Sequence, residues 1–276
     1  MRQCEILALP TALGADKRMI ALLPTLLLAA AAQPLQPTGK WSVEYNDGNC
    51  TLSRGFGDPA KPVVFGFKPY PQSMAGDLAL VLPKHGGAAL RTGHGTIMLT
   101  PGGKPLPVFW LSAPVADGDR RAYRFEVART FWETLAAAET ITFDPGGRPA
   151  ITVALGPIKG ALAALATCGD DLLRHWGADP AAMVMPSDLP QLVKWFDRAH
   201  YPGEAELTHQ QGRVITLTRF GPGGAPEDCR VVQTSGVPSL DKQTCATIMR
   251  YFKVPVVNLS ISKKRFMVLP VRWVMP

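Results

Sequence analysis

The chain has 276 residues, of which 46% are apolar and 18% charged, with 26 glycines and 26 prolines. This apolar share can fill a hydrophobic core and no short repeat runs through the chain, so collagen-like, coiled-coil and wholly disordered proteins are excluded. A net charge of +7 is too small for a chain of this length to indicate a nucleic-acid-binding protein.

The first 32 residues have the pattern of an export signal. Lys17 and Arg18 precede an apolar run, Met19–Ala32, which is 14 residues long. A helix needs about 20 residues to span a bilayer. Because the run is short and ends in an Ala-x-Ala pattern, we predict a signal peptide over residues 1–32, cleaved near Ala32-Gln33. The alternatives are an uncleaved anchor and a translation start at Met19.

Residues 38–180 are predicted to form an α+β domain, mainly of antiparallel strands closed by one helix. The helix is Ile158–Trp176, whose apolar residues recur every three to four positions and which Gly177 can end. A shorter helix is predicted over Thr130–Ala138. Strands are predicted where alternating or apolar runs lie between turns: Trp41–Tyr45, Val63–Phe67, Asp77–Leu82, Gly95–Thr100, Tyr123–Val127, Glu139–Phe143 and Ala150–Leu155.

A short linker is predicted over residues 181–190, because three prolines and little hydrophobic pattern occur around it. Residues 191–276 would then form a second, smaller domain. Residues 187–276 carry 12 basic and 7 acidic side chains, whereas residues 33–186 carry 14 and 13. The second domain therefore holds most of the excess positive charge.

The second domain has the predicted order helix, β-hairpin, helix, strand. A short helix is expected within Gly203–Gln211, followed by hairpin strands Gly212–Phe220 and Asp228–Ser235 around a glycine-rich turn. A proline and an aspartate within Gly236–Asp241 suit the first turn of the next helix. Lys264–Trp273 supplies the last strand.

Four cysteines follow the predicted signal peptide, and their even number in an exported chain favours disulfides. No Cys-x-x-Cys motif and no histidine at zinc-ligand spacing accompanies them, so we expect no metal. Four cysteines allow three pairings. We favour Cys50 with Cys168 and Cys229 with Cys245, because each bridge then stays within one predicted domain.

No catalytic motif is found. The sequence lacks a Gly-x-Ser-x-Gly elbow, a His-Glu-x-x-His pair and a phosphate-binding loop. His85 and His94 are expected in one glycine-rich loop, but no nearby carboxylate completes a metal site. We therefore expect a protein that is not an enzyme and has no cofactor; an envelope enzyme acting through loops of the first domain is the alternative.

The second domain resembles the TonB C-terminal domain family of Gram-negative bacteria. The resemblance rests on an ordered set of residues in the C-terminal third: Tyr201-Pro202, Ala205, Gly212, Val214, the glycine turn, Cys229, Val231, Thr234-Ser235-Gly236, Leu240-Asp241 and Pro255. It implies that Cys229–Cys245 is the additional disulfide of one subgroup. It also implies a periplasmic domain that binds an envelope protein or peptide, such as a segment of an outer-membrane transporter, by adding it as a strand.

The resemblance departs from energy-transducing members of the family in two places. They have an uncleaved anchor and a long Pro-rich spacer, whereas this chain has a short apolar N-terminus and an additional predicted domain. An anchored energy transducer for transport across the outer membrane is therefore the alternative to a periplasmic binding protein.

The edge of a three-stranded sheet has unpaired N–H and C=O groups to which an extended peptide can add. The residues expected to bind a partner in this way are Arg265, Phe266, Met267, Val268 and Leu269. Lys263, Lys264 and Arg265 would either steer an acidic partner or membrane surface, or guard the edge against aggregation. Pro270 would weaken the ladder beyond Leu269. Membrane contact is left open.

Overall fold

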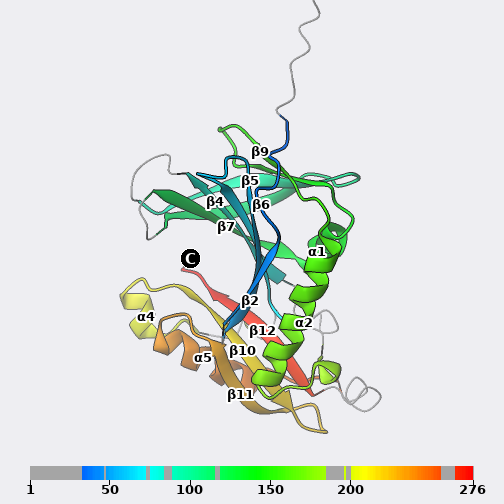
Figure 1. The fold of residues 1–276 in the computed structure, drawn as a ribbon. Helices are drawn as coiled ribbons and strands as arrows, with labels where there is room; N and C mark the ends of the chain where they lie inside the picture. Colours follow the sequence, from blue (N-terminus) through cyan, green and yellow to red (C-terminus); the bar gives the residue numbers. More distant parts are fainter. Residues whose placement is uncertain are drawn as a thin grey trace, which may run out of the picture. The chain divides into compact units, whose positions relative to one another are not determined.

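Nine strands form one curled antiparallel sheet, sheet A (Figure 1). The computed structural model describes residues 33–46, 48–72, 75–83, 89–115, 119–184, 196, 200–255 and 265–275, so the predicted signal peptide lies outside the described residues. The order of sheet A is β1-β2-β3-β4-β7-β6-β5-β8-β9. Its strands are β1 Ser42–Asn46, β2 Asn49–Phe56, β3 Val63–Pro69, β4 Ala75–Pro83, β5 Arg91–Thr100, β6 Leu106–Pro114, β7 Arg120–Ala128, β8 Thr140–Asp144 and β9 Ile151–Ala154.

One face of sheet A forms the larger hydrophobic core. In β7, Tyr123, Phe125 and Val127 are buried while Arg124 and Glu126 between them are exposed. This period of two is that of a strand with one face towards the core. The same core includes the aromatic side chains of β3 and β8.

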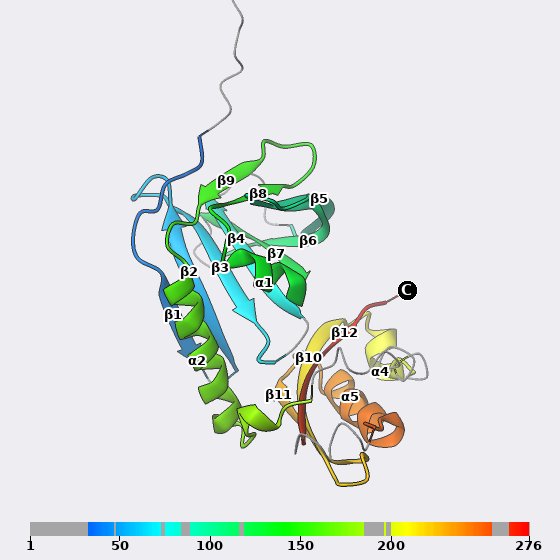
Figure 2. The same ribbon diagram turned by 90° about the vertical axis from the view of Figure 1, so that its right-hand side faces the viewer.

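Two helices accompany sheet A. Helix α1 covers Arg129–Leu135, and α2, Lys159–His175, packs against β1 and β2 (Figure 2). The predicted bridge Cys50–Cys168 is present and ties α2 to β2. Gly177 follows α2 with a φ of +79°, and its successor Ala178 donates to the Leu173 carbonyl at 2.9 Å. This confirms the glycine helix end, because a left-handed backbone there favours glycine.

The C-terminal residues form a second, three-stranded antiparallel sheet, sheet B, in the order β11-β10-β12. Its elements are α4 Gly203–Leu207, β10 Gly212–Phe220, β11 Pro226–Gln233, α5 Pro238–Tyr251 and β12 Phe266–Trp273. Helix α5 packs on one face of β10 and β11, and the predicted bridge Cys229–Cys245 joins it to β11. The predicted order of helix, hairpin, helix and strand is confirmed.

Sheets A and B belong to one compact unit of residues 33–276. The predicted domain boundaries at 180 and 191 stay a prediction. Within the predicted linker, Met183 and Val184 are buried, with 3% and 0% of their surface exposed. A 3-10 turn, η1, covers Pro180–Ala182 directly before them.

Two strands and one histidine differ from the sequence-based predictions. Strand β2 was missed because its buried residues alternate with polar ones and glycine, and β6 because it carries prolines near both ends. The loop predicted to hold His85 and His94 is wrong for His94, which lies within β5 and packs edge-to-face on Phe109. His85 lies outside the described residues.

We predict that both disulfides stabilise the folded protein, and that the bridge closing the longer loop contributes more. Their cysteines are 118 and 16 positions apart. If a bridge acts by restricting the unfolded chain, the Cys229→Ala/Cys245→Ala pair should lower the free energy of unfolding by about 3 kcal/mol, and the Cys50→Ala/Cys168→Ala pair by about 5 kcal/mol. Denaturant titration of each double variant measures this. Losses in the opposite order would contradict the chain-entropy account.

Candidate peptide-binding edge

Strand β12 is an outer strand of sheet B, as the sequence predicted for the last strand. It pairs with β10 along its whole length, from Phe266 opposite Arg219 to Trp273 opposite Gly212. Its side chains alternate between two cores. Met267 and Leu269 join the core under α5, whereas Val268 and the half-buried Phe266 join the larger core of sheet A.

Both faces of sheet B are therefore covered around β10 and β12. Ile215 and Leu217 of β10 belong to the larger core, while Val214 and Phe220 belong to the core under α5. Strands buried on both faces have nearly continuous apolar sequences. The cover on both faces explains why the burial of β10 is almost uninterrupted.

The chain itself occupies the outer side of β12 at its start. Met183 forms a parallel bridge with Phe266. The Arg265 N–H donates to the Ala182 carbonyl at 2.6 Å, and the Val184 N–H donates to the Phe266 carbonyl at 2.6 Å. Ala182–Val184, here called the edge segment, thus forms an isolated parallel bridge to the start of β12.

The side chains of the edge segment also follow strand geometry. Met183 lies in the larger core and Val184 in the core under α5, so successive residues point to opposite faces of the sheet. Each of the two backbone bonds is worth about 1 kcal/mol net, and a fully buried Val or Met side chain contributes about 2 kcal/mol. The bonds and the side chains together hold the segment in place.

The start of the predicted partner-binding edge, Arg265–Leu269, is covered by the edge segment. Met267 and Val268 are 0% exposed, Leu269 is 6% exposed, and the first outer backbone groups are bonded to the edge segment. Binding of a partner by these five residues stays a prediction, and it requires the edge to be uncovered. Lys263 and Lys264, expected to steer or guard, lie outside the described residues.

Pro270 sits where a missing N–H is tolerated. The Phe266 carbonyl points away from β10, and alternate residues of a strand point the same way, so the backbone groups of Val268 and Pro270 also face outward. Pro270 still lies opposite Ile215 of β10. It therefore leaves the inner pairing intact, and the weaker outer ladder beyond Leu269 stays a prediction.

The other edge strand, β11, has a different character. Charged residues Glu227, Asp228 and Arg230 lie along it, and its pairing with β10 shifts register at two places. Charges and bulges on an edge disfavour the addition of another strand. Of the two edges of sheet B, β12 is the apolar one.

The residues that carry the family resemblance mostly stabilise this module. Asp241 lies in the first turn of α5, and both oxygens of its carboxylate accept hydrogen bonds from the segment before the helix. Oδ1 accepts from the Ser235 N–H at 2.9 Å and Oδ2 from the Thr234 hydroxyl at 2.5 Å. Tyr201 packs edge-to-face on Trp273. A Cβ on Gly212 would lie 2.7 Å from the Ser235 Cβ, so only glycine fits there.

An ion-pair cluster joins β10 to sheet A. The Arg213 guanidinium donates to Asp77 at 2.6 Å and to Glu126 at 2.7 Å, and it also donates to the Tyr70 hydroxyl. Burial lowers the pKa of Arg213, but Asp77, Tyr70 and Glu126 more than offset this and raise it overall. Lys68 lies near the cluster, where burial lowers its pKa in spite of the opposing charge of Asp77.

Tyr70 gives this cluster a pH dependence. Its hydroxyl donates to Asp77 Oδ2 at 2.7 Å, and burial first and the negative charge of Asp77 second raise the pKa of Tyr70 far above its usual value. The folded state thus favours the neutral phenol. The contribution of the neutral Tyr70 phenol to the free energy of unfolding is complete below about pH 10. It declines as pH rises above about 10, because tyrosine in the unfolded chain then ionises.

We predict that Tyr70→Phe flattens the alkaline loss of stability. At pH 7 the variant should lose about 1 kcal/mol with the hydrogen bond to Asp77. Above pH 10 it should lose about 1.4 kcal/mol less per pH unit than the parent, because phenylalanine cannot ionise. Urea titrations from pH 7 to 11.5 measure this, with Tyr45→Phe, at a 51% exposed position, as the control. Parallel profiles for Tyr70→Phe and the parent would exclude this role.

Other candidate sites are weaker. Among the described residues, no group of three or more His, Cys, Asp or Glu side chains could hold a metal ion. None of the helices formed by the described residues has the length and hydropathy needed to cross a bilayer. The sequence-based predictions did not include Met183 and Val184 at this edge. The only indication of their role in the sequence is that they form an apolar pair within the proline-containing linker.

The comparisons with known proteins locate one family. Residues 197–275 match the family model described as Gram-negative bacterial TonB protein C-terminal. No curated protein and no solved structure matches the chain. The match covers α4 to β12, and it confirms the resemblance carried by the C-terminal third. The chain thus carries a TonB-like C-terminal domain, as a TonB-like envelope protein does.

Proposed function

We propose that this protein is a periplasmic binding protein whose TonB-like domain takes up an extended segment of an envelope protein as a strand along β12. An outer-membrane transporter is the partner class that the family match favours. Strand addition supplies main-chain hydrogen bonds for affinity and alternate side-chain pockets for selectivity. The proposal needs no catalytic group.

The observation that carries this proposal is the edge segment. Ala182–Val184 makes two backbone bonds to Arg265 and Phe266, and its successive side chains enter two different cores. The β12 edge therefore has the backbone geometry and side-chain pockets that an added strand requires. The more polar and irregular β11 has no such added strand among the described residues.

A periplasmic location fits the chemistry of the cysteines. Both bridges close within the described part of the chain, and disulfides persist in oxidising compartments such as the periplasm. The predicted signal peptide over residues 1–32 would provide export. A cleaved signal would leave no anchor, which favours binding over energy transduction.

We also propose that the protein acts by binding and not by catalysis. His94, the only described histidine of the glycine-rich stretch singled out in the sequence, packs on Phe109. The Arg272 guanidinium in turn lies over the Phe109 ring, with its central carbon 5.8 Å from the ring centroid. These contacts give His94 a packing role within β5 and β6.

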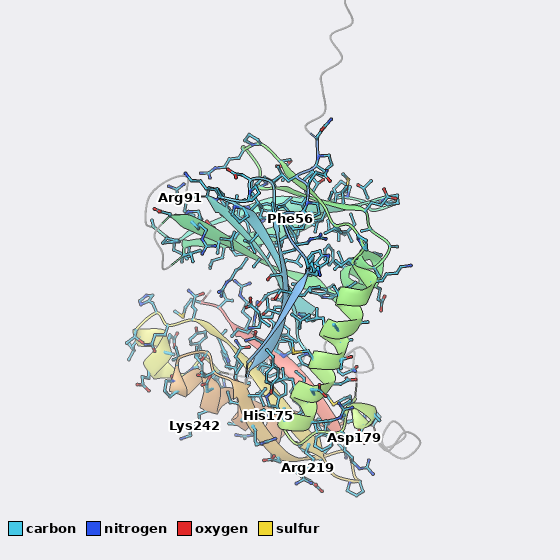
Figure 3. All side chains as sticks on the ribbon, in the orientation of Figure 1. Phe56, Arg91, His175, Asp179, Arg219 and Lys242 are labelled. Carbon is cyan, nitrogen blue, oxygen red and sulfur yellow. A yellow bond between two sulfur atoms is a disulfide. The ribbon has the colours of Figure 1, made fainter. Side chains whose placement is uncertain are left out.

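Site-specific photo-crosslinking tests the proposed surface. We predict that a photoreactive residue at Arg272, exposed near the end of β12, crosslinks one envelope protein through an extended segment when the full chain is exported in a Gram-negative host. The control is Lys242, exposed on α5 (Figure 3). Mass spectrometry of the adduct identifies the crosslinked segment. An adduct from Lys242 and none from Arg272 would place the binding surface elsewhere.

A further inference from the structure

We infer that the edge segment Ala182–Val184 keeps the β12 edge closed, and that a partner strand must displace it and present the same pattern of two successive apolar residues. The inference rests on the proposed function, since it concerns the same edge. It adds competition within the chain and a chemical requirement for the partner.

The competition follows from hydrogen-bond valence. The Arg265 N–H has one hydrogen to donate, and the edge segment takes it at 2.6 Å. The Phe266 carbonyl, at the same end, is bonded to Val184. Because Phe266 is paired with Met183, a second strand has no space beside it at the spacing of neighbouring strands. Binding at the start of β12 therefore excludes the edge segment.

The partner's chemistry follows from the surroundings of the two side chains. Met183 and Val184 are 3% and 0% exposed, and each lies in a hydrophobic core. A polar or charged replacement at either position would be buried without a hydrogen-bond partner, which is strongly unfavourable. A competing segment therefore needs adjacent apolar residues that enter the same two cores.

The edge segment can leave without unravelling sheet B. It is held by two backbone bonds and the two buried side chains of Met183 and Val184, whereas β12 pairs with β10 over eight residues. Before it, Asp179, labelled in Figure 3, accepts the Ala181 N–H at 2.9 Å and stabilises the turn η1. That turn contributes no strand to either sheet, so its movement breaks no ladder.

The test uses a labelled synthetic peptide, Asp179-Pro180-Ala181-Ala182-Met183-Val184-Met185, and the full chain in its oxidised form. Val184→Pro removes the N–H that bonds to Phe266, and Val184→Ala is the matched control that keeps this N–H. We expect Val184→Pro to bind the peptide about fivefold more tightly than Val184→Ala, the equivalent of one typical backbone bond. Fluorescence anisotropy measures the affinities.

A locked variant gives the opposite readout. Met183 and Phe266 are parallel neighbours, whose Cα atoms lie about 4.8 Å apart in such pairs, within the range of a disulfide. Met183→Cys/Phe266→Cys, with its third bridge verified by intact mass, should lose peptide binding. Met183→Ala is a second opening variant should Val184→Pro fail to fold.

Two results would overturn the inference: equal peptide affinity of the locked and opened variants, or no peptide binding by either opening variant. Capture of the same envelope protein at Arg272 in the parent and in the locked variant would also overturn it, because the partner would then bind without competition. Failure of the proposed function looks different. If Arg272 captures nothing while the opened variants bind the peptide, the closed edge exists but the proposed partner does not.

Discussion

The hydrogen-bonding groups on the outer side of β12 impose the main constraint on the C-terminal part of this protein. An apolar edge strand invites pairing with any extended chain, and natural proteins cover or interrupt such edges. Here Ala182–Val184 covers the start of β12, and Pro270 removes a donor farther along. Strand β11 needs no such cover, because charges and register shifts already disfavour pairing there.

Covering both faces of sheet B ties it to the rest of the protein. Ile215, Leu217 and Val268 belong to the larger core, on the face opposite α5. Without sheet A and α2 these side chains would be exposed, at a cost of about 2 kcal/mol each. The Arg213 cluster adds polar contacts across the same junction. The TonB-like domain therefore packs within the compact unit of residues 33–276.

The elements that local sequence patterns determine were predictable, and the contacts between distant elements were not. β7 alternates strictly, and α2 ends at a glycine, so both were recognised. The bridges followed from domain assignment. In contrast, Arg213 and Asp77 are 136 positions apart, and neither has a local signal that identifies the other. Met183 and Val184 have apolar side chains among prolines, which does not reveal that they pair with Phe266.

A covered edge is compatible with binding because the outer ladder is short. Pro270 limits the backbone bonds that any added strand can form, so a longer partner gains little from length alone. Each additional backbone bond would contribute only about 1 kcal/mol, whereas a buried apolar side chain contributes about 2 kcal/mol. Selectivity at this edge must then come mainly from the two positions now filled by Met183 and Val184. If a partner strand replaces this cover, the features that protect the edge from indiscriminate pairing also define which segment can do so.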